Sequence, residues 1–165
     1  MKRLNTLFLL ISILAANAIT AQTISAEDLN LMQGIWDGYL YYTDYQDDQS
    51  QVSLKTKLTV EVSNGSARLN FDYTEPNGKI VSSKSKMKYI DTEYFSYGGK
   101  NKIVEQMKND SSWKLVTETT GKDNNRSSLI RYEINVSSDT LNLRKLVKYD
   151  GTDVFFQRNS HTFTK

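Results

Sequence analysis

Apolar and polar residues alternate with a period of two from Ile35 to the C-terminal end of the chain. The segment 52–62 shows the pattern well, because its large apolar residues fall on one face. These residues are Val52, Leu54, Leu58, Val60 and Val62. Successive side chains of a β-strand point to opposite faces, so the alternation predicts strands with one buried face. The pattern returns in the segments 67–73, 113–118, 130–136 and 141–147.

Turn signals separate these segments at intervals of about 10 to 14 residues. Asn64-Gly65 is the strongest of them, since both residue types tolerate the positive φ that a two-residue hairpin requires. No helical pattern interrupts the series, so consecutive strands are expected to form hairpins. A sheet of this size protects its edges most simply by closing. We therefore predict one all-β domain over residues 22–165, a closed up-and-down antiparallel β-barrel of about 8–10 strands.

A short helix is expected before the first strand, within residues 22–34. Ser25 is the expected N-cap, and Glu27 and Asp28 suit the positive end of the helix dipole. Gly34 can end the helix. A helix of one or two turns is not stable alone, so we expect it to cover one end of the barrel.

Residues 1–21 have the pattern of a secretory signal peptide. Lys2 and Arg3 precede an apolar run and then small residues, and cleavage is expected after Ala21 or, alternatively, Ala18. The run is shorter than the roughly 20 residues that span a bilayer, so no stable membrane insertion is expected after cleavage. The sequence contains no cysteine, which excludes a lipid anchor on an N-terminal cysteine. These features predict a secreted or periplasmic protein.

Charge and composition argue against several function classes. The full chain has 21 basic and 19 acidic residues, and the predicted signal peptide removes two basic ones, leaving 19 of each. There is no basic cluster with an aromatic platform, so nucleic acid is not an expected partner. One histidine and no cysteine supply neither a thiolate nucleophile nor a zinc ligand set. We expect no catalytic residues, no metal and no cofactor.

The organisation resembles the lipocalin-like barrels of the calycin superfamily. In that family a short helix precedes a Gly-x-Trp motif on the first strand, and here Gly34-Ile35-Trp36 follows the predicted helix. The family also often packs a late-strand arginine across the tryptophan, and the resemblance implies this role for Arg158. Such a Trp36–Arg158 pair would seal one barrel end and would be structural.

A second resemblance, to nitrobindin-like barrels, depends on Gly34, Trp36 and Gly38 at the start of the first strand. That family binds haem through a histidine on its last strand, where this chain has its single histidine, His161. The period of the last strand places Arg158 and His161 on opposite faces. If Arg158 points inward, His161 is expected to point outward, away from any haem.

The segment 81–89 carries lysines on one face and serines on the other. If Lys84, Lys86 and Lys88 face water, then Ser83 and Ser85 face inward, which favours a hydrated interior or contact with a ligand. Tyrosines of neighbouring strands could add hydroxyl groups. The expected ligand-binding residues are Tyr42, Tyr73, Ser83, Ser85, Met87, Tyr89 and Tyr132. We expect a small, largely apolar molecule to bind in the interior without chemistry.

Two alternatives remain open. In the first, the barrel is a protein-interaction module with an exposed aromatic face on its first and last strands, made by Tyr39, Tyr41, Tyr45, Phe155 and Phe163. In the second, tyrosine and carboxylate groups in the cavity act as acid and base in an enzyme.

The acidic loop after the first strand, with Asp44, Asp47 and Asp48, lacks the glycine and glutamate of an EF-hand. It is therefore expected to be a solvated loop.

Overall fold

The computed structural model describes residues 23–47 and 49–165, so the predicted signal peptide lies outside the described residues. Within them the chain forms a closed antiparallel barrel of ten strands, preceded by a short 3-10 helix, as the sequence predicts. The elements are η1 (Glu27–Met32), β1 (Gly34–Thr43), β2 (Gln51–Ser63), β3 (Ser66–Thr74), β4 (Ile80–Tyr89), β5 (Tyr94–Tyr97), β6 (Lys100–Lys108), β7 (Ser112–Asp123), β8 (Arg126–Ser137), β9 (Thr140–Tyr149) and β10 (Phe156–Thr164).

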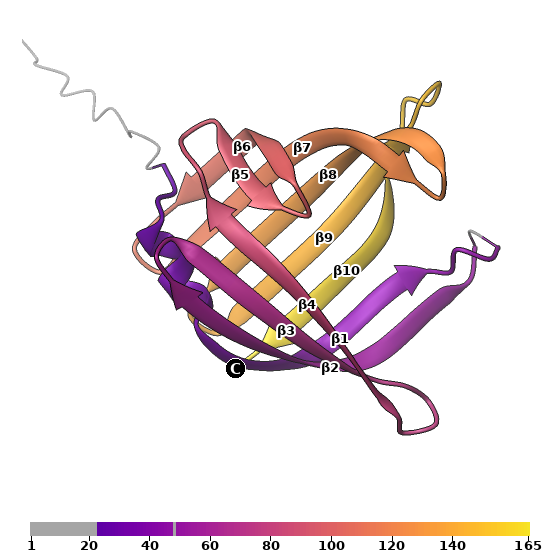
Figure 1. The fold of residues 1–165 in the computed structure, drawn as a ribbon, viewed down its shortest axis with the longest axis horizontal. Coiled ribbons are helices and arrows are strands. Elements are labelled where there is room, and N and C mark those ends of the chain that lie inside the picture. Colours follow the sequence, from indigo (N-terminus) through magenta and orange to yellow (C-terminus); the bar gives the residue numbers. More distant parts are fainter. Residues whose placement is uncertain (1–22, 48) are drawn as a thin grey trace, which may run out of the picture.

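Each strand pairs with its neighbours in sequence, and β10 closes the barrel on β1 (Figure 1). A two-residue hairpin connects β2 and β3 where the sequence predicts it, and a second one connects β7 and β8. Asn64 and Gly65 both have positive φ between β2 and β3, and Asn124 and Asn125 do so between β7 and β8. These are the backbone conformations that asparagine and glycine tolerate best.

One end of the barrel is filled by apolar side chains and covered by η1. The indole nitrogen of Trp36 donates to the Met32 carbonyl at 2.8 Å, and that of Trp113 donates to the Asp28 carbonyl at 2.9 Å. Leu29 and Met32 point into the core that these rings complete. The helix therefore covers this end, which we call the closed end, as predicted. No described helix is long and apolar enough to cross a membrane.

The expected N-cap at Ser25 is wrong, because its side chain accepts no hydrogen bond from the helix. The Ser25 backbone N–H and hydroxyl instead donate to the Asp28 carboxylate at 2.6 and 2.8 Å. Lys108 Nζ also lies 2.9 Å from this carboxylate. Burial raises the pKa of Asp28, but the contacts with Lys108 and Ser25 outweigh it and hold the pKa below its ordinary value.

The expected Trp36–Arg158 pair is also wrong. Trp36 lies at the closed end, where Lys165 Nζ sits 4.3 Å from its ring. Arg158 lies at the other end of β10, near the mouth of the barrel, and bonds to Asp123 and Tyr149. The register explains the separation, because Asp37 of β1 pairs with Thr164, at the far end of β10 from Arg158. The cation over the tryptophan comes from the last residue of the chain.

A bulge in β10 overturns the expected outward direction of His161. The register of β10 against β9 shifts between Gln157 and Asn159, so Arg158 is an extra residue on its strand. An extra residue reverses the phase of the alternation that follows it. Arg158 and His161 are consequently both buried, although a regular strand would place them on opposite faces.

We predict that Gly38→Ala strongly destabilises the barrel. A Cβ at this position would lie 1.9 Å from the Thr162 carbonyl oxygen and 2.9 Å from Phe163 Cα, so β1 and β10 would have to separate. The free energy of unfolding in urea should fall by about 3 kcal/mol or more.

Gly121→Ala is the matched control, because its added Cβ meets only the end of the Ile130 side chain, at 3.3 Å. A Gly38→Ala protein as stable as this control would show that the close approach of β1 and β10 is not required.

Candidate functional site

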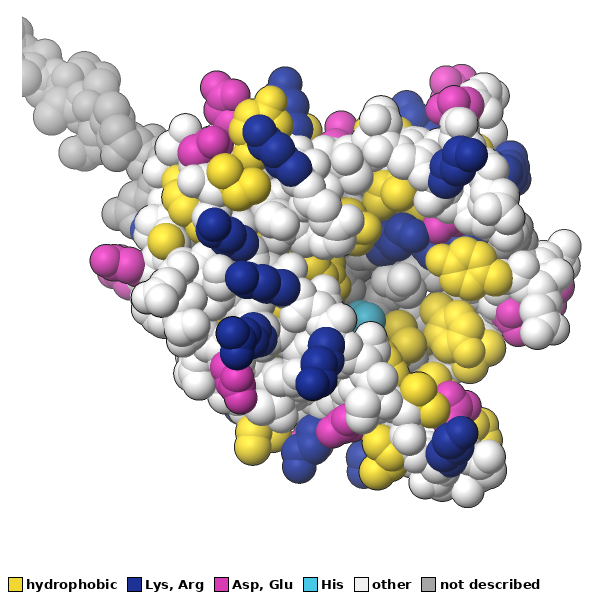
Figure 2. Space-filling model, in the orientation of Figure 1, with side chains coloured by type: hydrophobic (Ala, Val, Ile, Leu, Met, Phe, Trp, Pro, Cys, Tyr) yellow, Lys and Arg dark blue, Asp and Glu magenta, His cyan; other side chains and the backbone are white. Residues whose placement is uncertain are grey.

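The barrel is hollow toward its mouth, on the side away from η1. One pocket of about 320 Å³ and another of about 240 Å³ share Asn159 and His161, so the histidine lies between them. Figure 2 shows the single histidine side chain at the floor of this hollow. The larger pocket is lined by Leu40, Tyr42, Tyr45, Leu54, Tyr73, Asn159 and His161. The smaller pocket is lined by Ser85, Tyr97, Gly98, Tyr132, Leu143, Arg144, Lys145, Asn159 and His161.

His161 is held in an aromatic environment. Its ring centroid lies 4.9 Å from that of Phe71 and 5.7 Å from that of Phe163, and its Nε2 is 3.3 Å from the Tyr73 hydroxyl. The residue is 8% exposed, and burial lowers the pKa of its imidazole from 6.5 to about 4. The imidazole is therefore neutral at pH 7, with one ring nitrogen free of a proton.

Tyrosine hydroxyls line the hollow, and burial makes them weaker acids. Burial raises the pKa of Tyr73 to about 12 and also raises the pKa of Tyr97 and Tyr132. The Tyr97 and Tyr132 rings meet edge to face at 5.0 Å. General acid–base catalysis works best with a pKa near the working pH, so these groups suit hydrogen bonding better than proton transfer. The raised pKa values of these hydroxyls therefore give no support to acid–base chemistry in the cavity.

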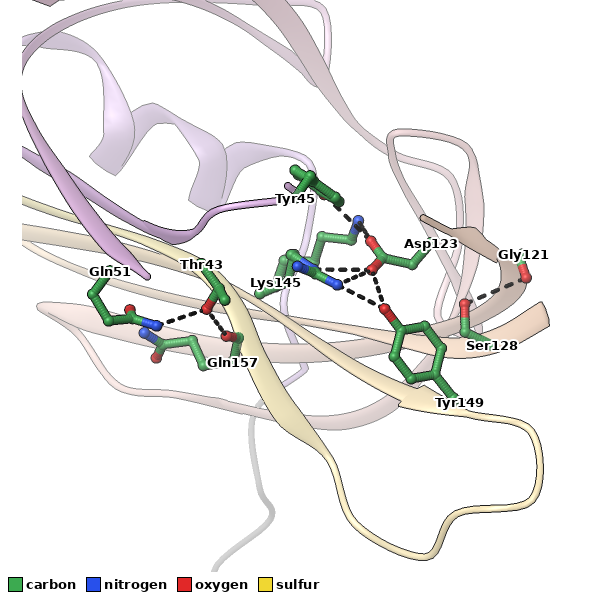
Figure 3. Close-up of polar contacts among 10 residues, drawn as sticks. Thr43, Tyr45, Gln51, Gly121, Asp123, Ser128, Lys145, Tyr149 and Gln157 are labelled. Atoms are coloured by element: carbon green, nitrogen blue, oxygen red, sulfur yellow. Dashed lines mark hydrogen bonds and ion pairs between the residues drawn. The ribbon is translucent and has the colours of Figure 1, made fainter. Parts of the chain in front are cut away.

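A buried ionic network borders the hollow at the mouth (Figure 3). Asp123, the last residue of β7, accepts from Arg158 Nε at 2.9 Å and from Lys145 Nζ at 2.7 Å. Arg158 also donates to the Tyr149 hydroxyl at 2.7 Å, and its guanidinium lies 4.3 Å from the Tyr45 ring. The network joins β7, β9 and β10 to the loop after β1.

The charges of this network stabilise one another. Burial raises the pKa of Asp123, but the hydrogen bond from Lys145 and the charges of Lys145 and Arg158 hold the pKa below its ordinary value. A buried carboxylate between two cations stays ionised, and each cation keeps a partner. Lys145 also lines the smaller pocket, so the network brings a positive charge to the wall of the hollow.

The structure brings together four of the seven expected ligand-binding residues. Tyr42 and Tyr73 line the larger pocket, and Ser85 and Tyr132 line the smaller one. The other three lie elsewhere. Met87 is fully buried in the core of the closed end, Tyr89 packs against that core, and Ser83 is exposed on β4.

Sequence reasoning missed several residues of the hollow, above all His161 and Asn159. Both follow the bulge at Arg158, which the alternation of β10 does not reveal. Lys145 and Asp123 were missed because they lie 22 residues apart on β9 and β7 and become neighbours only in the folded barrel.

Only part of the aromatic face predicted on the first and last strands is present. Tyr39 and Tyr41 are exposed on the outer face of β1, with ring centroids 6.2 Å apart. Phe163 is not part of this face, because it is buried in the core. The guanidinium of Arg131 lies over the Phe155 ring, 4.2 Å from its centroid. Tyr45 covers Arg158 at the mouth.

The described carboxylates of the acidic loop accept hydrogen bonds from backbone N–H groups of the same loop. Asp44 accepts from the Gln46 N–H at 2.9 Å, and Asp47 accepts from the N–H groups of Gln49 and Ser50 at 2.9 Å. Asp48 lies outside the described residues. Among the residues that are described, no group of three histidine or acidic side chains could hold a metal ion.

Comparison with known proteins supports the fold. No family model matches the chain, and no curated protein matches it in sequence. Among solved structures, the chain is similar to Rv2717c from M. tuberculosis, with a TM-score of 0.59 and 9% sequence identity. The match covers 87% of this chain and 99% of that protein. At this identity the similarity is one of fold alone.

We predict that His161 makes the protein less stable in weak acid. Its pKa is about 4 in the folded chain and close to its ordinary 6.5 in the unfolded chain, so between these values the unfolded chain binds more protons. The free energy of unfolding should therefore fall as the pH drops from 6.5 toward 4, by at most about 1.4 kcal/mol per pH unit.

Urea unfolding at several pH values between 6.5 and 4.5 measures this slope. His161→Gln removes the titrating group and should flatten the slope, while Asp28 and Asp123, whose pKa values are held below their ordinary value, are present in both proteins. Equal slopes in the two proteins would contradict the burial of a neutral His161.

Proposed function

We propose that this protein binds a small, largely apolar molecule in the hollow around His161, without catalysis. The supporting observation is the division of the interior into a filled half and a hollow half. Apolar side chains and η1 fill the closed end, whereas pockets of about 320 and 240 Å³ meet at His161 below the mouth. Concave sites with aromatic walls and a few polar groups are typical of small-molecule binding.

The walls of the hollow suggest how such a molecule would lie. Leu40, Leu54 and the ring of Tyr73 provide apolar surface on one side of His161. Ser85, Lys145 and the hydroxyl group of Tyr132 provide polar groups on the other side. A ligand with an apolar body and one polar end fits both sides. Export from the cytoplasm, which the pattern of residues 1–21 predicts, is part of the same proposal.

Blocking the larger pocket should abolish binding. Leu40 pairs with Leu54 on one side and with His161 on the other, so Leu40→Trp places a large ring in the pocket. The probe is 8-anilinonaphthalene-1-sulfonate, an amphipathic dye that fluoresces in apolar sites. We expect saturable binding to the unchanged protein and at least about tenfold weaker binding to Leu40→Trp, a loss of roughly 1.4 kcal/mol.

Tyr41→Trp is the control, because it adds an indole one residue away on the exposed face of β1. It should bind the dye like the unchanged protein. Circular dichroism should show the same fold in all three proteins. In a separate measurement, native mass spectrometry of the protein from its own host should show a retained small molecule. Equal dye affinity for Leu40→Trp and Tyr41→Trp would refute binding in the hollow.

Haem is a second candidate, which the inward position of His161 favours. A regular last strand would direct His161 outward, and the bulge in β10 turns it inward. His161 could hold the haem iron, because its imidazole is neutral at pH 7 and lies at the floor of a hollow with aromatic walls. Ligation through Nε2 would replace its contact with Tyr73. Bound haem would supply redox and gas-binding chemistry.

Titration with hemin decides between these candidates. If haem is the ligand, a Soret band should develop and saturate at one equivalent, His161→Ala should lose the band, and Tyr73→Phe should keep it. A spectrum that stays that of free hemin, or one unaffected by His161→Ala, excludes haem ligation by this residue. The dye experiment does not depend on this result, since it tests the pocket at Leu40.

A further inference from the structure

The mouth-side half of β4 is a free strand edge. β4 pairs with β3 from Ile80 to Lys88 but with β5 only from Met87 to Tyr89. From Ile80 to Lys86, no described strand pairs with the side of β4 that faces away from β3. Figure 1 shows β4 running across the front of the barrel, while the β5–β6 hairpin stays near the end that holds η1. The edge from Ile80 to Lys86 is regular and contains neither a proline nor a bulge.

The backbone groups that face this edge can be assigned from the ladder. The Tyr89 N–H donates to the Gly65 carbonyl at 3.2 Å, which continues the β3–β4 ladder by one residue. In an antiparallel pair, residues alternate between bonding to the partner strand and pointing away from it. Ser83 and Ser85 therefore bond to β3, like Tyr89. The N–H and C=O groups of Ser82, Lys84 and Lys86 point to the free side.

The side chains along the edge have opposite characters on the two faces. On the outer face, Lys84, Lys86 and Lys88 are exposed, and Arg68 lies opposite Lys86 on β3. None of these four cations forms an ion pair with the described residues. Figure 2 shows basic side chains gathered beside the hollow.

The inner face carries Val81 and Ser83, both of them exposed and paired across the ladder with Tyr73 and Phe71. Those two rings contact His161, so the inner face of the free edge continues into the aromatic wall of the hollow.

We propose that the free edge of β4 binds an extended acidic peptide segment as an added strand. The backbone groups of Ser82, Lys84 and Lys86 would complete their hydrogen bonds with the segment, as in other cases of strand addition. Acidic residues at alternate positions would face the lysines on the outer side. Apolar residues between them would face Val81 and Ser83 on the inner side. This binding surface borders the proposed small-molecule site but does not depend on it.

Charge selects this partner over a second copy of the chain. Two β4 strands paired edge to edge would place Lys84, Lys86 and Lys88 against the same lysines, and like charges across a pair are destabilising. Lysines on an edge commonly prevent self-association. The same row of cations is complementary to a strand with acids at every second position.

The probe is a fluorescein-labelled nine-residue peptide of alternating glutamate and valine, with blocked ends. A peptide with lysine in place of glutamate is its control. Fluorescence anisotropy with the mature protein should show saturable binding of the acidic peptide, weakening as salt is added, and no binding of the basic peptide. Equal binding of both peptides would overturn the proposal.

Charge reversal locates the site. Lys84→Glu combined with Lys86→Glu should weaken binding of the acidic peptide at least about tenfold. Lys55→Glu combined with Lys57→Glu makes the same charge change on exposed residues of β2, a strand paired on both sides. This control should retain affinity within about twofold. Equal losses in the two double variants would overturn the assignment to β4.

A backbone test separates strand addition from simple charge attraction. Lys84→Ala and Lys84→Pro both remove the lysine, but only proline removes the N–H that faces the free edge, where proline is tolerated. The proline variant should bind more weakly than the alanine variant. Hydrogen exchange at Lys84 and Lys86 should slow when the peptide is added, whereas exchange at Ser83 and Ser85 should not change.

Unchanged exchange at Lys84 and Lys86 would refute an added strand. A concentration-dependent dimer that disappears in the Lys84→Glu, Lys86→Glu protein would instead assign the edge to a second copy, and would also overturn the proposal.

Discussion

Closure of β10 on β1 is the constraint on which the rest of the structure depends. The first and last strands meet only when every intervening hairpin has formed, so the contact is non-local and comes at a cost in chain entropy. Gly38 allows the close approach, because its missing Cβ leaves room for the Thr162 carbonyl and the backbone of Phe163. Once the strands meet, Phe163 lies in the core beside Phe71, and the closed end can be filled.

The two ends of the barrel are stabilised by different kinds of interaction. At the closed end, apolar burial dominates, and the indole N–H groups of Trp36 and Trp113 donate to the Met32 and Asp28 carbonyls of η1. Near the mouth, Asp123 and Arg158 are 1% and 0% exposed as side chains, so the cost of removing them from water must be offset by their mutual contacts. The ionic network holds polar side chains together at the mouth. If apolar side chains packed there instead, they would fill the hollow.

Much of the fold follows from the sequence, because strand period and turn chemistry are local properties. The alternation around Val60 and the Asn64-Gly65 turn give the meander directly, and closure follows from the need to protect edges. The site follows less well. The extra residue at Arg158 reverses which face of the sheet the following side chains of β10 point to. The alternation of apolar and polar residues in β10 does not indicate this bulge. The position of His161, and with it the character of the hollow, therefore required the three-dimensional structure.

The length of the β5–β6 hairpin connects the hollow to the free edge. β5 has four residues, so it pairs with β4 only near Tyr89 and leaves the remainder of that strand without a partner. A longer β5 would pair with Lys84 and Lys86 and extend the wall of the barrel toward the mouth. The short hairpin therefore accounts for both the accessible interior beside Ser85 and the unsatisfied backbone of β4. Since a regular free edge favours association, the lysines on its outer face restrict which strand can bind there.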